Sequence, residues 1–279
     1  MGQKLVTIVS VAYGSMDVLP AMAASLPPDT PLVIVDNGDD DGLRDWARLA
    51  GHDLRLPGRN IGFGAACNLG AEGAQSEFLF FLNPDARLEP GALAALLDAA
   101  TRHGDACGFG PAILREDGSV FSVNPSIIIP RTTRGKRGLR PQEEVARPSL
   151  NGAALFIRRA AFEAIGGFDP AIFLYFEDDD LTLRLARDIG KLMYVPAARI
   201  THASGGSTQP SAALARFKGY HYARSYIHVL GKHGRRHPWA VGAMDALRRC
   251  LSLRFLTRSD KRNDAIGRWQ GVMSMWRAG

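Results

Sequence analysis

Cysteine is scarce in this chain of 279 residues, which contains only Cys67, Cys107 and Cys250. Their number is odd and no two of them form a C-x-x-C pair, so neither a disulfide framework nor a zinc knuckle is expected. This usage fits a reducing compartment best, and we expect a cytoplasmic protein.

Long apolar runs are also missing. No stretch of about 18 or more apolar residues occurs, so no transmembrane helix is expected. The N-terminal segment "MGQKLVTIVSVAYGS" has a short apolar run without a small-residue cleavage site, which indicates a buried strand rather than a signal peptide. Apolar residues still make up 46% of the chain, enough for one large α/β domain with a helical extension.

Two nucleotide-binding fingerprints are absent. The segment "GRNIGFGAACNLG" contains Gly62, Gly64 and Gly70, but their spacing is not G-x-G-x-x-G and no G-K-[ST] follows. A dinucleotide fingerprint and a P-loop are therefore excluded. The glycines could still let backbone N–H groups approach a ligand closely.

Acidic residues are rare at the C-terminal end. From residue 216 onward the chain has 14 Lys and Arg against 3 Asp and Glu, while the remainder carries a small acidic excess. Such a basic tail suits phosphates, an anionic membrane surface or nucleic acid. Its aromatic residues are not interleaved as a base-stacking platform, so no nucleic-acid partner is expected.

Apolar strand patterns alternate with helical patterns through the first two thirds of the chain. The strands "KLVTIVSVAY", "PLVIVD", "EFLFFLN" and "ACGFGPAIL" are separated by amphipathic segments such as "DGLRDWARLA" and "PGALAALLDAATRHG". This alternation predicts an α/β fold with a mostly parallel central sheet flanked by helices. Polar residues follow the strands, and ligands bind at that edge of such sheets: Tyr13, Asp36, Asn37, Asn83 and Asp85.

The last sixty or so residues are expected to form a basic helical extension. Within it Met244, Leu247, Leu251 and Phe255 form an apolar stripe, and several arginines lie off that stripe. The favoured interpretation is an ordinary amphipathic helix that packs on the catalytic domain. The alternative is a helix lying on the anionic inner leaflet of the membrane.

Four consecutive acidic residues, from Glu177 to Asp180, follow the apolar segment "IFLYF". Desolvation and like-charge neighbours both raise a carboxyl pKa, toward the range useful for a general base. The acids could equally begin a helix, where they favour the macrodipole, and Asp180 could pair with Arg184 four residues later; both interpretations can hold at once.

Three other polar positions are ambiguous when taken alone. Asp85, in an Asn-Pro-Asp sequence, could hold a divalent cation or could belong to a turn, and the turn is favoured. Asp36 could bind a ribose or a base, or could cap the turn after its strand. His202 ends a strand, where a structural histidine is more common than a neutral metal ligand.

Together, seven segments resemble the inverting glycosyltransferases of family two, which have the type-A nucleotide-sugar-binding fold. They occur in the family's order across about residues 4 to 208, and the subgroup most similar is the bacterial rhamnosyltransferases. The segments are "VTIVSVAYGS", "VIVDNG", "RNIGFGAACNLG", "FLFFLNPDA", "NGAALFIRR", "GGFDPAIFLYFEDDDLTLRLARDIG" and "YVPAARITHASGGS".

The resemblance implies roles for individual residues. Asp178 takes the position of the catalytic base, and Asp179 a variable position. Asp85 matches the last acid of the D-x-D metal element and His202 a metal-proximal histidine, while Asn83 replaces the first acid. The implied nucleotide-binding residues are Ala12, Tyr13, Asp36, Asn37, Arg59, Asn60, Asn68 and Asn83; Gly152, Glu177 and Asp180 would lie on the acceptor side.

The resemblance also implies a reaction and a domain plan. A Mg²⁺- or Mn²⁺-dependent enzyme would move L-rhamnose from dTDP-rhamnose to a polyprenyl-diphosphate-linked or saccharide acceptor, at or near the inner face of the plasma membrane. A UDP-hexose or UDP-N-acetylhexosamine donor is the first alternative, and a non-catalytic nucleotide or nucleic-acid binder the second. The catalytic domain would span 1–210, with nucleotide-binding (1–115) and acceptor-binding (116–210) parts, followed by the extension at 211–279.

Overall fold

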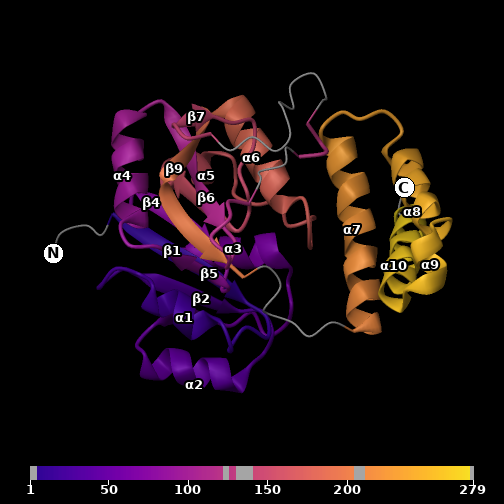
Figure 1. Ribbon diagram of the computed structural model, residues 1–279, viewed down its shortest axis with the longest axis horizontal. Coiled ribbons are helices and arrows are strands. Elements are labelled where there is room, and N and C mark those ends of the chain that lie inside the picture. Colours follow the sequence, from indigo (N-terminus) through magenta and orange to yellow (C-terminus); the bar gives the residue numbers. More distant parts are fainter. Residues whose placement is uncertain (1–4, 122–125, 130–140, 204–210, 277–279) are drawn as a thin grey trace. The chain divides into compact units, whose positions relative to one another are not determined.

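The computed structural model describes residues 5–121, 126–129, 141–203 and 211–276 (Figure 1). The strands are β1 (Val6–Ala12), β2 (Leu32–Asp36), β3 (Asp53–Arg55), β4 (Phe78–Leu82), β5 (Ala86–Leu88), β6 (Ala106–Leu114), β7 (Val145–Ala146), β8 (Ala154–Arg158) and β9 (Lys191–His202). The helices are α1 (Leu19–Ala24), α2 (Asp41–Leu49), α3 (Phe63–Ala71), α4 (Ala92–Arg102), α5 (Arg159–Ala164), α6 (Glu177–Asp188), α7 (Ala212–Lys232), α8 (Pro238–Cys250), α9 (Leu253–Thr257) and α10 (Ser259–Trp276).

The strands form one sheet in the order β3-β2-β1-β4-β8-β6-β9-β5, with β7 paired to β9. The pairs β1–β2, β1–β4, β2–β3 and β6–β9 are parallel, as the strand–helix alternation predicts. Strand β8 runs antiparallel to β4 and β6, and β5 and β7 run antiparallel to β9. The α/β fold with a central sheet flanked by helices is confirmed, but the sheet of the described residues is mixed rather than mostly parallel, with four antiparallel pairs beside four parallel ones. The short strands β5 and β7 carry too few residues for a periodic signal.

Helices cover both faces of the sheet. Neighbouring residues of a strand point to opposite faces, and in β1, β2 and β4 the residues on both faces are mostly apolar and buried. In β4, Phe80 belongs to one buried cluster together with residues of α1, α2 and α4. The next residue, Phe81, belongs to a second cluster with residues of α3, α5 and α6. Strands β1, β2 and β4 are buried along their whole length, which explains why they read as continuous apolar runs.

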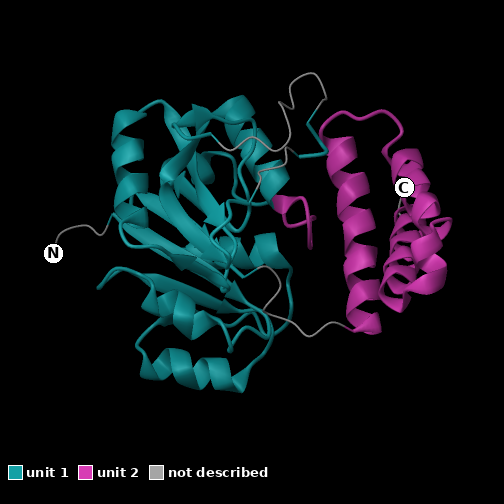
Figure 2. Ribbon diagram, in the orientation of Figure 1, with its two compact units in different colours: residues 1–168, 178–208 teal, residues 169–177, 209–279 magenta. Residues whose placement is uncertain are grey.

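The chain divides into two compact units, which Figure 2 shows in different colours. The first comprises residues 1–168 and 178–208 and contains the sheet. The second comprises residues 169–177 and 209–279 and contains α7 to α10. Residues 169–177, which are expected from the sequence to belong to the catalytic domain, thus group with the C-terminal helices.

In the second unit, glycines allow α7 and α10 to approach each other closely. A Cβ atom at Gly267 would lie 2.0 Å from the carbonyl oxygen of Arg216, and one at Gly271 would lie 2.4 Å from that of Tyr220. Only glycine permits backbones at this separation. None of the helices in the described residues is both long and apolar enough to cross a membrane.

The apolar stripe of the extension is not a core stripe. Met244, Leu247 and Leu251 are 51%, 49% and 78% exposed, while Phe255 is half-buried, so the expectation that the stripe fills a core is wrong for its first three members. The face of α8 that packs carries Gly242 and Ala246 instead, and both are buried. Small residues suffice there because α8 lies close against Ile227 of α7.

Candidate active site

The predicted site residues follow strands that end at one edge of the sheet. The register pairs Ala12 with Asp36, the last residues of β1 and β2. Leu82 at the end of β4 pairs with Ala154 at the start of the antiparallel β8. His202 at the end of β9 pairs with Ala86. The ends of β1, β2, β4 and β9, and the start of β8, therefore lie at the same edge of the sheet.

Asp36 is buried and tied into the turn after β2. Its Oδ1 accepts a hydrogen bond of 3.1 Å from the backbone N–H of Gly38, and its Oδ2 one of 2.9 Å from that of Asp40. The Nε of Arg44 in α2 donates to the same Oδ2 at 3.2 Å. The turn-capping interpretation is confirmed, and a contact of Asp36 with base or ribose stays a prediction.

Asn37 fastens the glycine-containing loop beside the end of β2. Its Oδ1 accepts from the backbone N–H of Ile61 at 2.9 Å, and its Nδ2 donates to Oδ1 of Asn60 at 3.0 Å. Asn60 Oδ1 also accepts from the N–H of Gly62, whose φ of 88° favours glycine. The structure thus brings Asn37 and Asn60 together as one network that shapes the loop before α3.

The remaining nucleotide-side residues differ in their surroundings. Tyr13 is 44% exposed in the loop after β1, and Arg59 is exposed. The side-chain amide of Asn68, by contrast, both donates to the carbonyl of Phe168 and accepts from its N–H, at 2.8 and 2.9 Å. Asn68 therefore braces α3 against a segment 100 residues away, and its predicted role in lining the nucleotide pocket is untested.

Asp85 and His202 meet through the pairing of β5 with β9. The His202 Nε2 lies 3.1 Å from Oδ1 of Asp85, and both side chains are largely buried, with 17% and 7% exposed. The Nδ2 of Asn83 lies 3.5 Å from the same His202 nitrogen. The sequence separates Asp85 from His202 by more than a hundred residues, and the fold brings their side chains into contact. Their metal-binding roles stay a prediction.

The donor set at this point fits a divalent cation that takes further ligands from a diphosphate. A carboxylate and a neutral imidazole are both ligands of Mn²⁺, and Mg²⁺ is commonly held by one or two carboxylates plus substrate phosphates. Within the described ranges, no group of three or more His, Cys, Asp and Glu side chains could hold a metal by itself. The two protein ligands would be Asp85 and His202, since Asn83 stands where a second acid is expected.

Asp178 lies in the first turn of α6 and faces the loop before β8. Its Oδ2 accepts a hydrogen bond of 2.8 Å from the backbone N–H of Gly152. Burial raises the pKa of the Asp178 carboxyl above its ordinary value, and hydrogen bonds from backbone N–H groups oppose this only in part. A carboxylate with a raised pKa accepts a proton more readily, which is what a general base requires.

Asp180 points into the interior of the first unit. It is fully buried, and the Nε of Arg184 donates to its Oδ2 at 2.9 Å. Arg184 also donates to the carbonyls of Ile165 and Gly167, at 2.9 and 2.7 Å. The alternative interpretation of an Asp180–Arg184 pair is confirmed, and acceptor contact by Asp180 would require breaking a buried ion pair.

A strained segment precedes the proposed base and was not anticipated from the sequence. Tyr175 and Phe176 have φ values of 70° and 68°, in the left-handed region that bulky residues rarely adopt. Their rings pack against Tyr222 and Tyr226 of α7 in the same unit. Strain of this kind clusters at functional sites and persists where packing over-determines it. The only signal in the sequence was the density of aromatic residues in "IFLYF".

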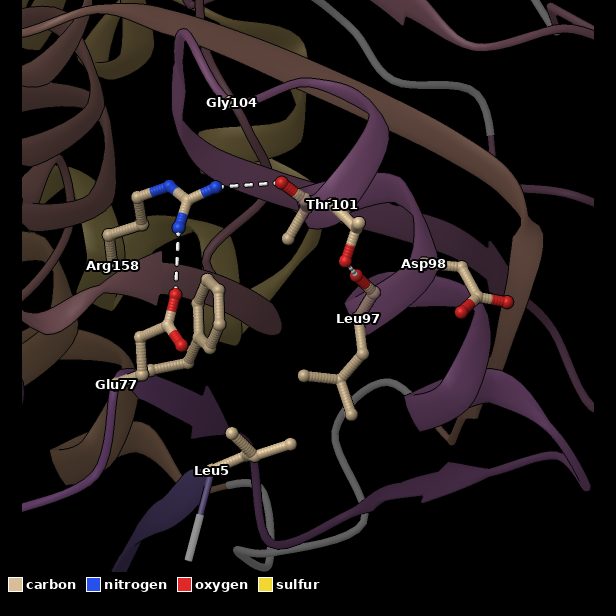
Figure 3. A pocket seen from close by; sticks show the side chains of 9 residues that line it. Leu5, Glu77, Leu97, Asp98, Thr101, Gly104 and Arg158 are labelled. Atoms are coloured by element: carbon tan, nitrogen blue, oxygen red, sulfur yellow. Dashed lines mark hydrogen bonds and ion pairs between the residues drawn. The ribbon is translucent and has the colours of Figure 1, made fainter. Parts of the chain in front are cut away.

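A separate pocket lies at the opposite edge of the sheet and is not the candidate site. Figure 3 shows it at the beginning of β4 and the end of β8, with Arg158 reaching toward Glu77. The guanidinium of Arg158 donates to Glu77 and to the carbonyls of Ala100 and Ala106. Its donors are therefore used within the protein, which indicates a structural role.

The sequence of residues 9–166 matches the model of a known family, described as "Glycosyl transferase family 2". The chain belongs to glycosyltransferase family 2. It is 33% identical over 298 residues to the N-acetylglucosaminyl-diphospho-decaprenol L-rhamnosyltransferase of Mycobacterium tuberculosis, covering 91% of this chain and 95% of that protein. It is 27% identical over 220 residues to the rhamnosyltransferase WbbL of Escherichia coli, covering 71% and 83%.

The fold of this family 2 glycosyltransferase is confirmed by a solved structure. The mannosyltransferase PcManGT of Pyrobaculum calidifontis, solved in complex with GDP-Man and Mn²⁺, superposes with a TM-score of 0.55 at 14% identity. The superposition covers 98% of this chain and 88% of the other. The type-A glycosyltransferase fold is thus shown, and the enzyme class, a glycosyltransferase, follows from family membership.

Proposed function

We propose that the protein transfers L-rhamnose from dTDP-L-rhamnose to a polyprenyl-diphosphate-linked or saccharide acceptor, with inversion at the anomeric carbon. One observation supports inverting transfer above all others. The Asp178 carboxylate accepts a hydrogen bond from the backbone N–H of Gly152, and burial raises its pKa. The sugar and the acceptor are supported by likeness over nearly the whole chain to a rhamnosyltransferase whose name specifies a decaprenyl-linked acceptor.

The reaction is a single displacement. The acceptor hydroxyl oxygen attacks the anomeric carbon and forms the new glycosidic bond, while the bond to the diphosphate breaks and its electron pair leaves with the diphosphate. Asp178 takes the proton of the attacking hydroxyl as the bond forms. Because attack comes from the face opposite the leaving group, the configuration inverts and no covalent enzyme intermediate forms.

The other strand-end residues would bind and orient the donor. The loop shaped by Asn37 and Asn60, together with Arg59, Tyr13 and Asp36, would hold the nucleotide, and Asn83 would lie near the diphosphate. A divalent cation bound by Asp85 and His202 would supply Lewis-acid stabilisation of charge on the diphosphate. The acceptor would approach on the side of Gly152 and Glu177.

A lipid-linked acceptor also places the reaction at a membrane surface. We therefore propose that the enzyme works as a peripheral protein on the inner face of the plasma membrane. The support for this is the acceptor named for the mycobacterial relative and the basic C-terminal extension.

A donor panel tests the proposal. Purified protein is incubated with Mg²⁺ or Mn²⁺ and dTDP-rhamnose, UDP-glucose, UDP-galactose or UDP-N-acetylglucosamine, and with a short polyprenyl-diphosphate-linked N-acetylglucosamine. We expect transfer from dTDP-rhamnose, with inversion seen as the anomeric proton signal of the product. Transfer from a UDP-sugar alone would contradict the rhamnose assignment, and nucleotide binding without turnover of any donor would contradict catalysis.

A further inference from the structure

The second unit presents a cluster of exposed apolar side chains on α8, α9 and the turn between them. We call this the α8–α9 face. Leu251, Leu253 and Leu256 are 78%, 75% and 72% exposed, which is unusual for three leucines within six residues. Met244 and Leu247 extend the cluster along α8, at spacings that place them on the same side of the helix as Leu251. Solvent-exposed clusters of this kind mark interaction sites.

The exposed side chains of the α8–α9 face do not belong to the packed core of the second unit. The packing side of α8 is occupied by Gly242 and Ala246, and Ala246 belongs to a buried cluster with Ile227 of α7 and Val272 of α10. At 100° per residue, Leu251 lies on the opposite side of α8 from Gly242. The bundle is therefore complete without the exposed leucines, which contribute nothing to its core.

The charge around the α8–α9 face is strongly positive. Residues 238–262 contain six basic and two acidic residues. The two acids, Asp245 and Asp260, are already engaged in ion pairs with arginine or lysine side chains. Arg248, Arg254 and Arg262 are exposed, and in the part of the chain that the structure describes no ion pair involves them. The leucines are thus bordered by cationic groups that point to an anionic partner.

We propose that the α8–α9 face docks on an anionic lipid bilayer, with the leucines entering the acyl boundary and the arginines contacting lipid phosphates. An apolar patch flanked by arginines matches both layers of such a surface, because long basic side chains reach the headgroups while their neighbours are buried. A nucleic acid would use the charges but leave the leucines in water. The docking itself is inferred from the surface alone. Only its biological reason, access to a lipid-linked acceptor, rests on the proposed function.

Flotation with vesicles tests this docking. The protein of 279 residues is mixed with phosphatidylcholine vesicles, with or without phosphatidylglycerol, at low and high salt. We expect flotation with anionic vesicles at low salt and much less with neutral vesicles. The combined substitutions L251S, L253S and L256S, and separately R248Q, R254Q and R262Q, should each lower partitioning roughly tenfold or more.

Two controls make the same kinds of change at exposed positions of the first unit. L49S replaces a leucine of α2 that is 83% exposed, and R48Q replaces its exposed neighbour. Both should float like the wild type. Hydrolysis of the sugar nucleotide in the absence of vesicles should be unchanged in every variant, so a failure of docking is distinguishable from a failure of the proposed function.

Three results would overturn the docking proposal. The first is absence of wild-type flotation with anionic vesicles at low salt. The second is equal flotation of the leucine variant and the L49S control. The third is a dimer, seen by light scattering, that the leucine substitutions convert to a monomer, because the α8–α9 face would then be an interface between two copies.

Discussion

The backbone N–H of Gly152 donates a hydrogen bond of 2.8 Å to Oδ2 of Asp178. The contact leaves no room for a side chain at position 152: a Cβ atom there would lie 2.6 Å from the same oxygen and 2.8 Å from the Asp178 Cβ. Gly152 is thus a positioning residue for the proposed base. Its N–H fixes the position of one oxygen of that carboxylate.

Gly152→Ala is therefore expected to displace the Asp178 carboxylate. Misplacement of a reacting group by about 1 Å can lower turnover on the order of a hundredfold, while nucleotide affinity should be unchanged. Displacement of the carboxylate would also break its hydrogen bond with the backbone N–H of residue 152, which favours the ionised form. The acidic limb of kcat/KM against pH should therefore move to higher pH. Steady-state kinetics across pH measure both effects.

A glycine-to-alanine change in open space is the control for this experiment. Gly104 precedes β6, and a Cβ atom there meets nothing within 4 Å. Gly104→Ala should retain wild-type kinetics. If Gly152→Ala also retains them, or shifts the pH profile to lower pH, then Gly152 does not position the base.

The metal-side prediction concerns Asp85. Asp85→Asn should weaken the binding of the donor nucleotide in the presence of Mg²⁺ or Mn²⁺, because one of two protein ligands loses its charge. Calorimetric titration of the nucleotide diphosphate, with the cation and with EDTA, measures the difference. Asp98→Asn, on an exposed position of α4, is the matched control. An affinity of the wild type that is the same with cation and with EDTA would contradict a metal role.

Breaking the buried ion pair of Asp180 and Arg184 is expected to lower the free energy of unfolding strongly. Asp180→Asn leaves the Arg184 guanidinium buried without its counter-charge, and such changes cost roughly 3–5 kcal/mol of the free energy of unfolding. Asp188→Asn, on the exposed end of the same helix, should change stability little, because its partner Arg187 is also exposed. Urea unfolding monitored by circular dichroism compares the two. Equal stabilities would show that Asp180 is not a structural brace.

The raised pKa of Asp178 predicts that this residue weakens the fold at neutral pH. The pKa of an aspartate in an unfolded chain is about 3.9. Since the folded-state pKa lies higher, the free energy of unfolding falls as pH rises from the unfolded value through the folded one, and the loss persists above it. Asp178→Asn should therefore raise Tm at pH 7 and lose this advantage at acidic pH. A lower Tm than the wild type at pH 7 would contradict the raised pKa.

Much of the strand-end geometry could be predicted because it depends on local pattern. Buried runs such as "FLFFL" end in polar residues, and parallel strands deliver those residues to one edge. The sequence therefore predicts that Asp36 and Asp85 lie at that edge, and their roles there stay predictions that the family resemblance implies. His202 needed the family resemblance, since a lone histidine after a strand has no specific signal. The β5–β9 pairing then showed that it meets Asp85.

Other features depended on contacts between distant segments, which no local pattern encodes. Asn68 looks like any polar residue on a helix, and only its pairing with the backbone of Phe168 shows it to be a brace. In the sequence, Gly152 looks like an ordinary turn residue, and only its contact with Asp178 in the structure shows why glycine is required there. The stripe of Met244 and Leu247 has the spacing of a core face, and nothing in that spacing says that Gly242 and Ala246 occupy the core instead.

Sugar transfer by Asp178→Asn tests the central claim most directly. The asparagine can still accept the Gly152 hydrogen bond but cannot take a proton, so transfer from the donor should fall by about 10²–10⁴-fold. Nucleotide binding, measured by calorimetry on the same preparation, should be retained. Asp179→Asn, the neighbouring change at a position that the family leaves variable, should keep wild-type transfer. Transfer by Asp178→Asn at a rate near that of the wild type would contradict the assignment of Asp178 as the base.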